Sequence, residues 1–312
     1  MGSLLHAVFV GPFQDMASSP TFLAEVFLGG IATGLMYSLV ALGFVLIFKA
    51  SGVFNFAQGV MVLFAALTLV GLMEKGVPVP IALLLTMAAM VALAFAIERV
   101  VLRPLVNQEP IILFMATIGL NFFLEGFGEM LWGANVKRLD VGIPDRSVVL
   151  AGIQVNQLEM SAAGTAAVLV TVLAVFFQRT RIGRALRAVA DDHEAALSIG
   201  IPLKTIWIIV WSVAGLVAIV AGIMWGAKSG VQFSLSLIAL KALPVLILGG
   251  FTSVPGAVVG GLIVGVGEKL GEVYWGPLVG GAIENWFAYV VALVFLLFRP
   301  QGLFGEKIIE RV

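Results

Sequence analysis

The sequence predicts an all-α fold, a polytopic transmembrane helical bundle with about nine hydrophobic crossings (eight to ten). Hydrophobic residues make up 61% of the 312 residues, charged residues only 12%, and the mean hydropathy is +1.10. Soluble domains are roughly 45–50% apolar and about 25% charged, so this composition is typical of a bilayer protein. Nine apolar stretches approach or reach the roughly 20 residues that a crossing helix requires.

These nine stretches follow one another along most of the chain. They lie near residues 26–48, 54–73, 80–102, 111–132, 160–178, 205–227, 231–249, 256–272 and 279–298. The seventh contains Lys241 and Pro244, and the eighth is short and rich in glycine. Residues 231–272 therefore predict either two short or tilted crossings or one re-entrant hairpin.

The positions of Lys and Arg favour an orientation with the N-terminus outside and the C-terminus inside. In that orientation the inner connections carry eleven Lys and Arg and the outer connections six, with Lys241 inside the membrane zone. An excess of basic residues on the cytoplasmic side is the usual pattern. We expect one membrane domain at 21–305, an N-terminal extension at 1–20 without a cleaved signal peptide, and a cytoplasmic tail at 306–312.

Two connections are long, one on each side of the membrane. The outer one, 133–159, has a Val/Leu/Ile pattern that is compatible with a short hairpin. The inner one, 179–204, predicts an amphipathic helix between about 184 and 199, because apolar residues recur at helical spacing. Gly200 and Pro202 are a typical stop signal for such a helix. A short polar helix in this position either lies on the membrane or docks into another protein.

Glycines four residues apart recur in the apolar stretches. The pairs are Gly30/Gly34, Gly256/Gly260, Gly261/Gly265, Gly267/Gly271 and Gly276/Gly280. Such pairs let helix backbones approach closely in a membrane, so we interpret them mainly as packing sites. The alternative is that some of them line a flexible transport pathway.

Several polar residues in apolar stretches are candidates for lining a substrate pathway, because ionisable groups in hydrocarbon are costly and often functional. Asn121 and Glu125 lie four residues apart and therefore share a helix face. A hydrogen bond between helices, or an ion pair of Glu125 with Lys241, is the structural alternative. Lys241 could also pair with Glu98 or extend its side chain toward the interface.

Asn55 and Gln58 are further pathway candidates, at the inner start of the second stretch. They either cap that helix or form an inner gate.

Composition and spacing exclude several classes of function. The chain has no cysteine and only two histidines, which excludes disulfides and leaves no metal-ligand spacing. It contains no Gly-Lys dipeptide, so the phosphate-binding loop G-x-x-x-x-G-K-[ST] is absent. No nucleophile–base constellation suggests an enzyme, and zero net charge gives no reason to expect a nucleic-acid partner.

Longer motifs carry a resemblance to a known family. Glu194-Ala195-Ala196 followed after three residues by Gly200 resembles the EAA-x3-G signature of ABC importer permeases. More specific stretches are Gly34–Gly43 (GLMYSLVALG), Val53–Gly59 (VFNFAQG), Glu98–Pro104 (ERVVLRP), Thr180–Arg187 (TRIGRALR), Leu248–Gly256 (LGGFTSVPG) and Phe298–Phe304 (FRPQGLF). In order and spacing, residues 25–305 resemble the permease family of branched-chain amino acid ABC importers, which includes urea and short-chain amide permeases.

The resemblance implies a multi-pass protein of the bacterial cytoplasmic (inner) membrane that imports a small polar solute. Branched-chain or other neutral amino acids are the first expectation, and urea, amides or aromatic acids are alternatives. The implied partners are a second related permease, two cytoplasmic ATP-binding subunits that bind ATP–Mg, and an extracytoplasmic solute-binding protein. The chain itself would hold no cofactor and no catalytic residue.

The resemblance also assigns coupling to the ATP-binding subunits to the inner connection. The residues concerned are Arg184, Arg187, Glu194, Ala195, Ala196 and Gly200. A different class, a stand-alone ion-coupled transporter, would instead make Lys241 and Glu125 the coupling charges.

Overall fold

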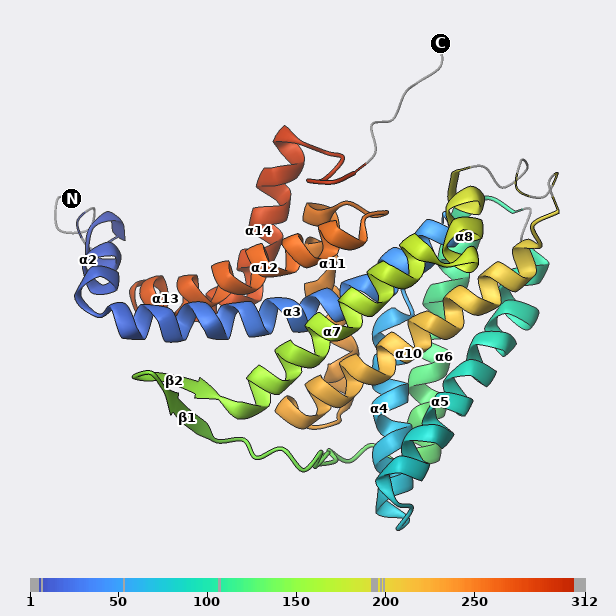
Figure 1. The fold of residues 1–312 in the computed structure, drawn as a ribbon, viewed down its shortest axis with the longest axis horizontal. Coiled ribbons are helices and arrows are strands. Elements are labelled where there is room, and N and C mark those ends of the chain that lie inside the picture. The colour runs from blue at the N-terminus through green and yellow to red at the C-terminus, as the bar shows by residue number, and fades with distance from the viewer. Residues whose placement is uncertain are drawn as a thin grey trace.

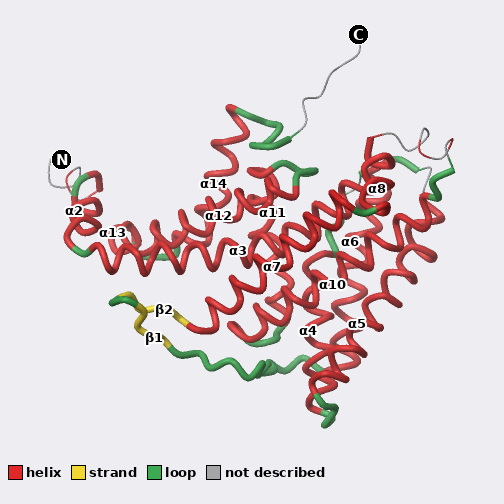
Figure 2. The backbone as a smooth tube through the Cα atoms, in the orientation of Figure 1, coloured by secondary structure: helices red, strands yellow, loops and turns green. Residues whose placement is uncertain are grey.

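The computed structural model describes residue 6 and residues 8–52, 54–105, 108–191, 196, 198 and 200–305. Helices make up most of this part of the chain (Figure 2). It contains six helices that are long and apolar enough to cross a membrane, together with three shorter apolar helices. The predicted all-α bundle is therefore confirmed, and the nine apolar helices follow the predicted order.

The first half of the chain supplies the helical core and one edge of the bundle (Figure 1). Its elements are α2 (Gly11–Ser18), α3 (Pro20–Ser51), α4 (Gln58–Glu74), α5 (Val79–Ala96) with the π-helical extension η1 (Ile97–Leu102) and the 3-10 turn η2 (Arg103–Leu105), and α6 (Pro110–Trp132). In α3, 83% of the apolar window is buried, against 28% in α5 and α6. The central helix α3 is therefore packed by protein on most sides, whereas α5 and α6 leave most of their apolar surface at the periphery of the bundle.

The second half begins with a hairpin and continues with helices. Its elements are β1 (Ser147–Leu150), β2 (Ile153–Asn156), α7 (Gln157–Arg179), α8 (Arg181–Asp191), α10 (Leu203–Ser229), the 3-10 helix η3 (Phe233–Leu237), α11 (Ile238–Gly249), α12 (Val254–Leu270), the π-helix η4 (Gly271–Trp275), α13 (Gly276–Val279) and α14 (Ile283–Phe298). The hairpin expected in the outer connection is present, with Val148 opposite Val155. Ala151 and Gly152 form its turn with positive φ, which suits a two-residue hairpin loop.

The eighth apolar stretch is longer than the sequence indicates. Its helical segment runs for 26 residues from Val254 to Val279, because η4 and α13 continue α12. The seventh stretch is a separate, shorter helix, η3 with α11. Pro244 lies inside α11 without ending it.

Glycine packing fixes α12 against the central helix α3. A Cβ at Gly34 would lie 2.5 Å from the Gly261 carbonyl oxygen, and a Cβ at Gly30 would lie 2.7 Å from the Cα of Val266. Backbones can approach this closely only without side chains. The packing interpretation is thus confirmed for Gly30, Gly34 and Gly261, whereas Gly280 has open space around it and a positive φ instead.

Candidate functional site

A break in the helical backbone lies between α3 and α4. The sequence predicts helix from residue 54, but residues 54 and 55 are not helical, 56 and 57 form a turn, and α4 starts at Gln58. The side chain of Gln58 lies against Gly43, eight residues before α3 ends. At 1.5 Å per residue, the first residue of α4 therefore lies about 12 Å back along the axis of α3 from the point at which α3 ends.

Side chains satisfy the backbone groups of this break. The Phe56 amide donates to Thr117 Oγ1 of α6 at 3.0 Å, and the Ala57 amide donates to Asn55 Oδ1 at 3.1 Å. Thr117 in turn donates to the Phe114 carbonyl at 2.8 Å. Non-helical backbone at membrane depth is tolerated only where protein buries it or where it lines a cavity. Asn55 thus stabilises a turn before α4, whereas α4 itself has no side-chain cap at its N-terminus.

Gln58, like Asn55, is buried, and none of its surface is exposed. Both of its amide atoms lack a hydrogen-bond partner among the described residues. The next residue, Gly59, packs on Ser236 and Ala239, so the start of α4 rests directly on η3 and α11.

A cavity of about 300 Å³ opens beside the break. It is bounded by three groups of side chains: the aromatic residues Phe44, Phe54 and Phe56, the apolar residues Leu237, Leu240 and Leu243, and the polar residues Asn121, Glu125 and Ser236. Asn121 and Glu125 are half-buried, and they face the cavity together, as their spacing predicts. A largely apolar cavity with a few converging polar groups is the usual form of a small-ligand site.

The ion pair between Lys241 and Glu125, one of the alternatives for these two residues, is not formed in the described part of the chain. Among the described residues the ion pairs are Lys137–Glu74 and Lys228–Glu159. Lys241 instead lines a second cavity of about 160 Å³ with Tyr37 and Trp225. Leu240 and Leu243 occupy the face of α11 toward the Glu125 cavity, and Lys241 projects from a different face because adjacent helical residues are about 100° apart.

The pathway candidates are therefore separated in space. Asn121 and Glu125 share the larger cavity, Asn55 and Gln58 lie buried behind it, and Lys241 lines the smaller cavity.

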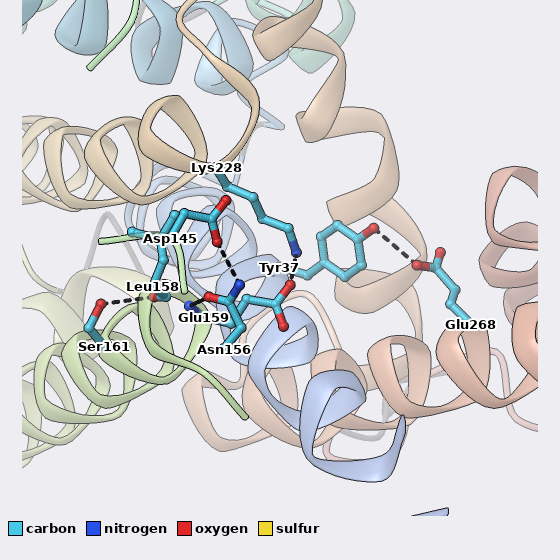
Figure 3. A network of polar contacts seen from close by, with 8 residues as sticks. All are labelled: Tyr37, Asp145, Asn156, Leu158, Glu159, Ser161, Lys228 and Glu268. Atoms are coloured by element: carbon cyan, nitrogen blue, oxygen red, sulfur yellow. Dashed lines mark hydrogen bonds and ion pairs between the residues drawn. The ribbon is translucent and has the colours of Figure 1, made fainter. Parts of the chain in front are cut away.

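A buried polar contact that the sequence reading missed lies near Lys241. The Tyr37 hydroxyl donates to Glu268 Oε2 at 3.0 Å, and each residue is only 3% exposed (Figure 3). Tyr37 also stacks on Trp225, with ring centroids 5.4 Å apart. Glu268 was a detectable candidate, since it is an acid within an apolar, glycine-rich stretch.

The helix α8, which follows the C-terminal end of α7, packs onto the membrane helices. Its helix starts at Arg181, earlier than expected, and Leu186 and Val189 are buried against the core. Arg187 Nη1 donates to the Phe177 carbonyl at 2.9 Å, and Arg184 Nη1 to the Arg179 carbonyl at 3.5 Å. Both arginines therefore satisfy carbonyls at the C-terminal end of α7, where a cation is favourable.

The rest of the expected coupling segment is described only in part. Glu194 and Ala195 lie outside the described residues, and Ala196 is buried. Gly200 has a φ of +84°, and the Ile201 amide donates to the Ala196 carbonyl at 3.0 Å. This is the hydrogen bond of a glycine C-cap, so the expected stop at Gly200 is confirmed.

Comparison with known proteins identifies the family. The model of the branched-chain amino acid transport system permease component matches residues 26–299. The chain belongs to this permease family. It is a multi-pass protein of the inner membrane and a channel-forming subunit of the ABC transporter class, not an enzyme.

Two curated relatives match this permease along nearly its whole length, and a third matches a shorter part of it. The branched-chain amino acid permease protein BraD of Pseudomonas aeruginosa is 29% identical, over 91% of this chain and 96% of the relative. The branched-chain amino acid permease protein LivH of Escherichia coli K12 is 28% identical, over 93% of this chain and 98% of the relative. The fructose import permease protein FruG of Bifidobacterium longum is 24% identical over 75% and 70%.

Among solved structures, PsaBC from Streptococcus pneumoniae in complex with Fab covers 93% of this chain and 96% of its own, at a TM-score of 0.46 and 13% identity. That similarity is too weak to carry a structural conclusion.

Proposed function

We propose that this permease moves branched-chain or other neutral amino acids inward, using ATP hydrolysed by separate subunits. The observation that carries the proposal is the family match over residues 26–299, together with relatives named for branched-chain amino acid transport. A relative named for fructose import is more distant in identity and coverage. This difference favours an amino acid over a sugar.

The cavity beside the α3–α4 break supports an amino-acid substrate. Its polar groups, Asn121, Glu125 and Ser236, lie opposite an apolar wall that contains Leu240 and Leu243. A neutral amino acid has the matching chemistry, with a charged backbone end and an apolar side chain. We propose this cavity as part of the path that the solute follows.

The inner connection supports coupling to ATP-binding subunits. α8 is attached to the membrane helices through Leu186 and Val189, while Arg184 is exposed. Residues up to Gly200 would then transmit movement of the ATP-binding subunits to α7 and α10. In this proposal two such subunits bind ATP–Mg, a second related permease completes the channel, a solute-binding protein delivers the solute, and this chain holds no cofactor.

Uptake into proteoliposomes tests the proposal directly. The complete complex, with its partner permease, ATP-binding subunits and solute-binding protein, is expected to take up radiolabelled leucine only with internal ATP. Unlabelled isoleucine and valine should compete, whereas urea and fructose should not. Uptake of urea or fructose in place of leucine would contradict the amino-acid assignment. ATP-independent leucine uptake by this chain alone would contradict the ABC mechanism.

A further inference from the structure

Glu125 presents an uncompensated carboxylate to the larger cavity. It belongs to α6, a 23-residue apolar helix, and it forms no ion pair or hydrogen bond with any described residue. A carboxylate within an apolar segment is costly and normally pairs with a cation or faces a polar ligand. The half-buried position of Glu125 at the cavity wall leaves its carboxylate accessible to a positively charged group that enters the cavity.

Aromatic rings surround the same cavity. Phe44 and Phe54 stack with centroids 4.8 Å apart, and Phe114 lies 6.2 Å from both Phe54 and Phe56. Phe44, Phe54 and Phe56 themselves line the cavity. The face of an aromatic ring attracts a cation within about 6 Å, most strongly where water is excluded. A carboxylate beside several phenylalanine rings is therefore suited to an ammonium group.

The other polar groups fit the rest of an amino acid. The Ser236 hydroxyl already donates to the Phe233 carbonyl at 2.8 Å, so its free lone pairs can accept from an ammonium. Asn121 is four residues from Glu125 on the same face, and its amide can donate to a carboxylate. Leu240 and Leu243 offer an apolar surface for the side chain.

We propose that Glu125, together with the surrounding rings of Phe44, Phe54 and Phe56, binds the α-ammonium group of the transported amino acid. The identity of the ligand rests on the proposed function, whereas the preference of the cavity for a cation does not. Glu125 thereby discriminates amino acids from urea and sugars, which carry no positive charge. A lysine or arginine of a partner subunit seated on Glu125 is the competing explanation, and the test below separates the two.

Charge-selective labelling tests the preference without relying on transport. The chain contains no cysteine, so Ser236→Cys gives it a single thiol, which lies at the cavity, and the complex with the unsubstituted chain measures the background. We compare a trimethylammonium-ethyl with a sulfonato-ethyl methanethiosulfonate reagent in the complete complex. After correction for their rates with free cysteine, the cationic reagent should react at least about fivefold faster. The attraction between its charge and the Glu125 carboxylate at close range is large enough to produce a rate difference of this size.

The second variant tests whether Glu125 causes the preference. Combining Ser236→Cys with Glu125→Gln should bring the corrected ratio close to one. The matched control is Glu129→Gln, one turn further along α6, exposed and outside the cavity, which should leave the ratio unchanged. Equal rates in the first comparison, as expected if a partner cation occupies Glu125, overturn the inference. A preference that survives Glu125→Gln overturns it as well.

Protection of the thiol by ligands then tests whether the cavity recognises the ammonium group of an amino acid. Leucine should slow labelling of Ser236→Cys by the cationic reagent, whereas 4-methylpentanoate, which lacks the ammonium group, should not. Equal protection by both compounds, or by neither, overturns ammonium recognition. The uptake assay tests the proposed function separately, so a complex without leucine uptake but with a Glu125-dependent charge preference would refute the function and leave a cation site.

Discussion

The Tyr37 hydroxyl donates a 3.0 Å hydrogen bond to Glu268, and this contact joins α3 to α12 in the buried centre of the bundle (Figure 3). The second carboxylate oxygen of Glu268, Oε1, has no hydrogen-bond partner among the described residues. Among the described residues, the side chain of Glu268 therefore depends on Tyr37 for its hydrogen bond.

Replacing Tyr37 by phenylalanine should destabilise the permease. The ring can keep its stacking on Trp225, but both Glu268 oxygens would lack a partner. Leaving a buried polar group unsatisfied costs about 1–3 kcal/mol, so we expect a lower midpoint of thermal unfolding in detergent. Tyr289→Phe in α14, where the side chain is 42% exposed, is the control. Equal midpoints for the two variants would show that the contact contributes nothing to stability.

The crossing of α3 and α12 should be intolerant of any side chain at Gly34. Gly34→Ala puts a methyl group 2.5 Å from the Gly261 oxygen and 3.0 Å from the Cα of Leu262, and such overpacking costs about 1–3 kcal/mol. We expect less folded protein and a lower unfolding midpoint by fluorescence-detected size-exclusion chromatography. Gly164→Ala in α7, which meets open space, should be neutral or stabilising because alanine favours helices. Matching losses in the two variants would contradict the packing argument.

Elements that depend on local rules were predictable from the sequence. The glycine spacing predicted the close approach at Gly34, the apolar length predicted the crossings, and Gly200 ends its segment with positive φ as expected. Gly280 obeys a different local rule, because its positive φ rather than packing requires glycine.

Features that depend on distant partners were not predictable. The apolar pattern extends helix to residue 54, but Thr117 of α6 stabilises a non-helical backbone there, so tertiary contacts override local propensity. Tyr37 and Glu268 are 231 residues apart, and nothing local pairs them. The surroundings of Lys241 stayed open among several alternatives, because the face of α11 that meets α6 depends on how the whole helix is rotated in the bundle.

Asn121→Ala should change transport without affecting assembly. Asn121 is half-buried at the cavity wall, and the variant removes a hydrogen-bonding amide while leaving the helix intact. A lost hydrogen bond of about 0.5–1.5 kcal/mol corresponds to a roughly two- to tenfold change in transport rate or in the relative rates of leucine and valine. Asn285→Ala, at an exposed position in α14, is the control. Wild-type rates and selectivity for Asn121→Ala would exclude Asn121 from the pathway.

The segment ending at Gly200 should control ATP hydrolysis by the partner subunits. Gly200→Val forces a β-branched residue to a φ of +84°, which strains the turn before α10 by about 1–3 kcal/mol. We expect solute-stimulated ATP hydrolysis to be lost while affinity for the solute-binding protein stays unchanged. Charge reversal by Glu194→Lys should have the same effect.

Gly142→Val provides the matched control for Gly200→Val. Gly142 also has positive φ, at +74°, and open space around it, but it lies in the predicted outer loop. Its backbone strain is therefore similar, and its distance from the proposed coupling segment makes stimulated hydrolysis insensitive to it. If Gly142→Val abolished stimulation as fully as Gly200→Val, strain on folding would explain both variants. If neither affected stimulation, the inner connection would not be the coupling segment.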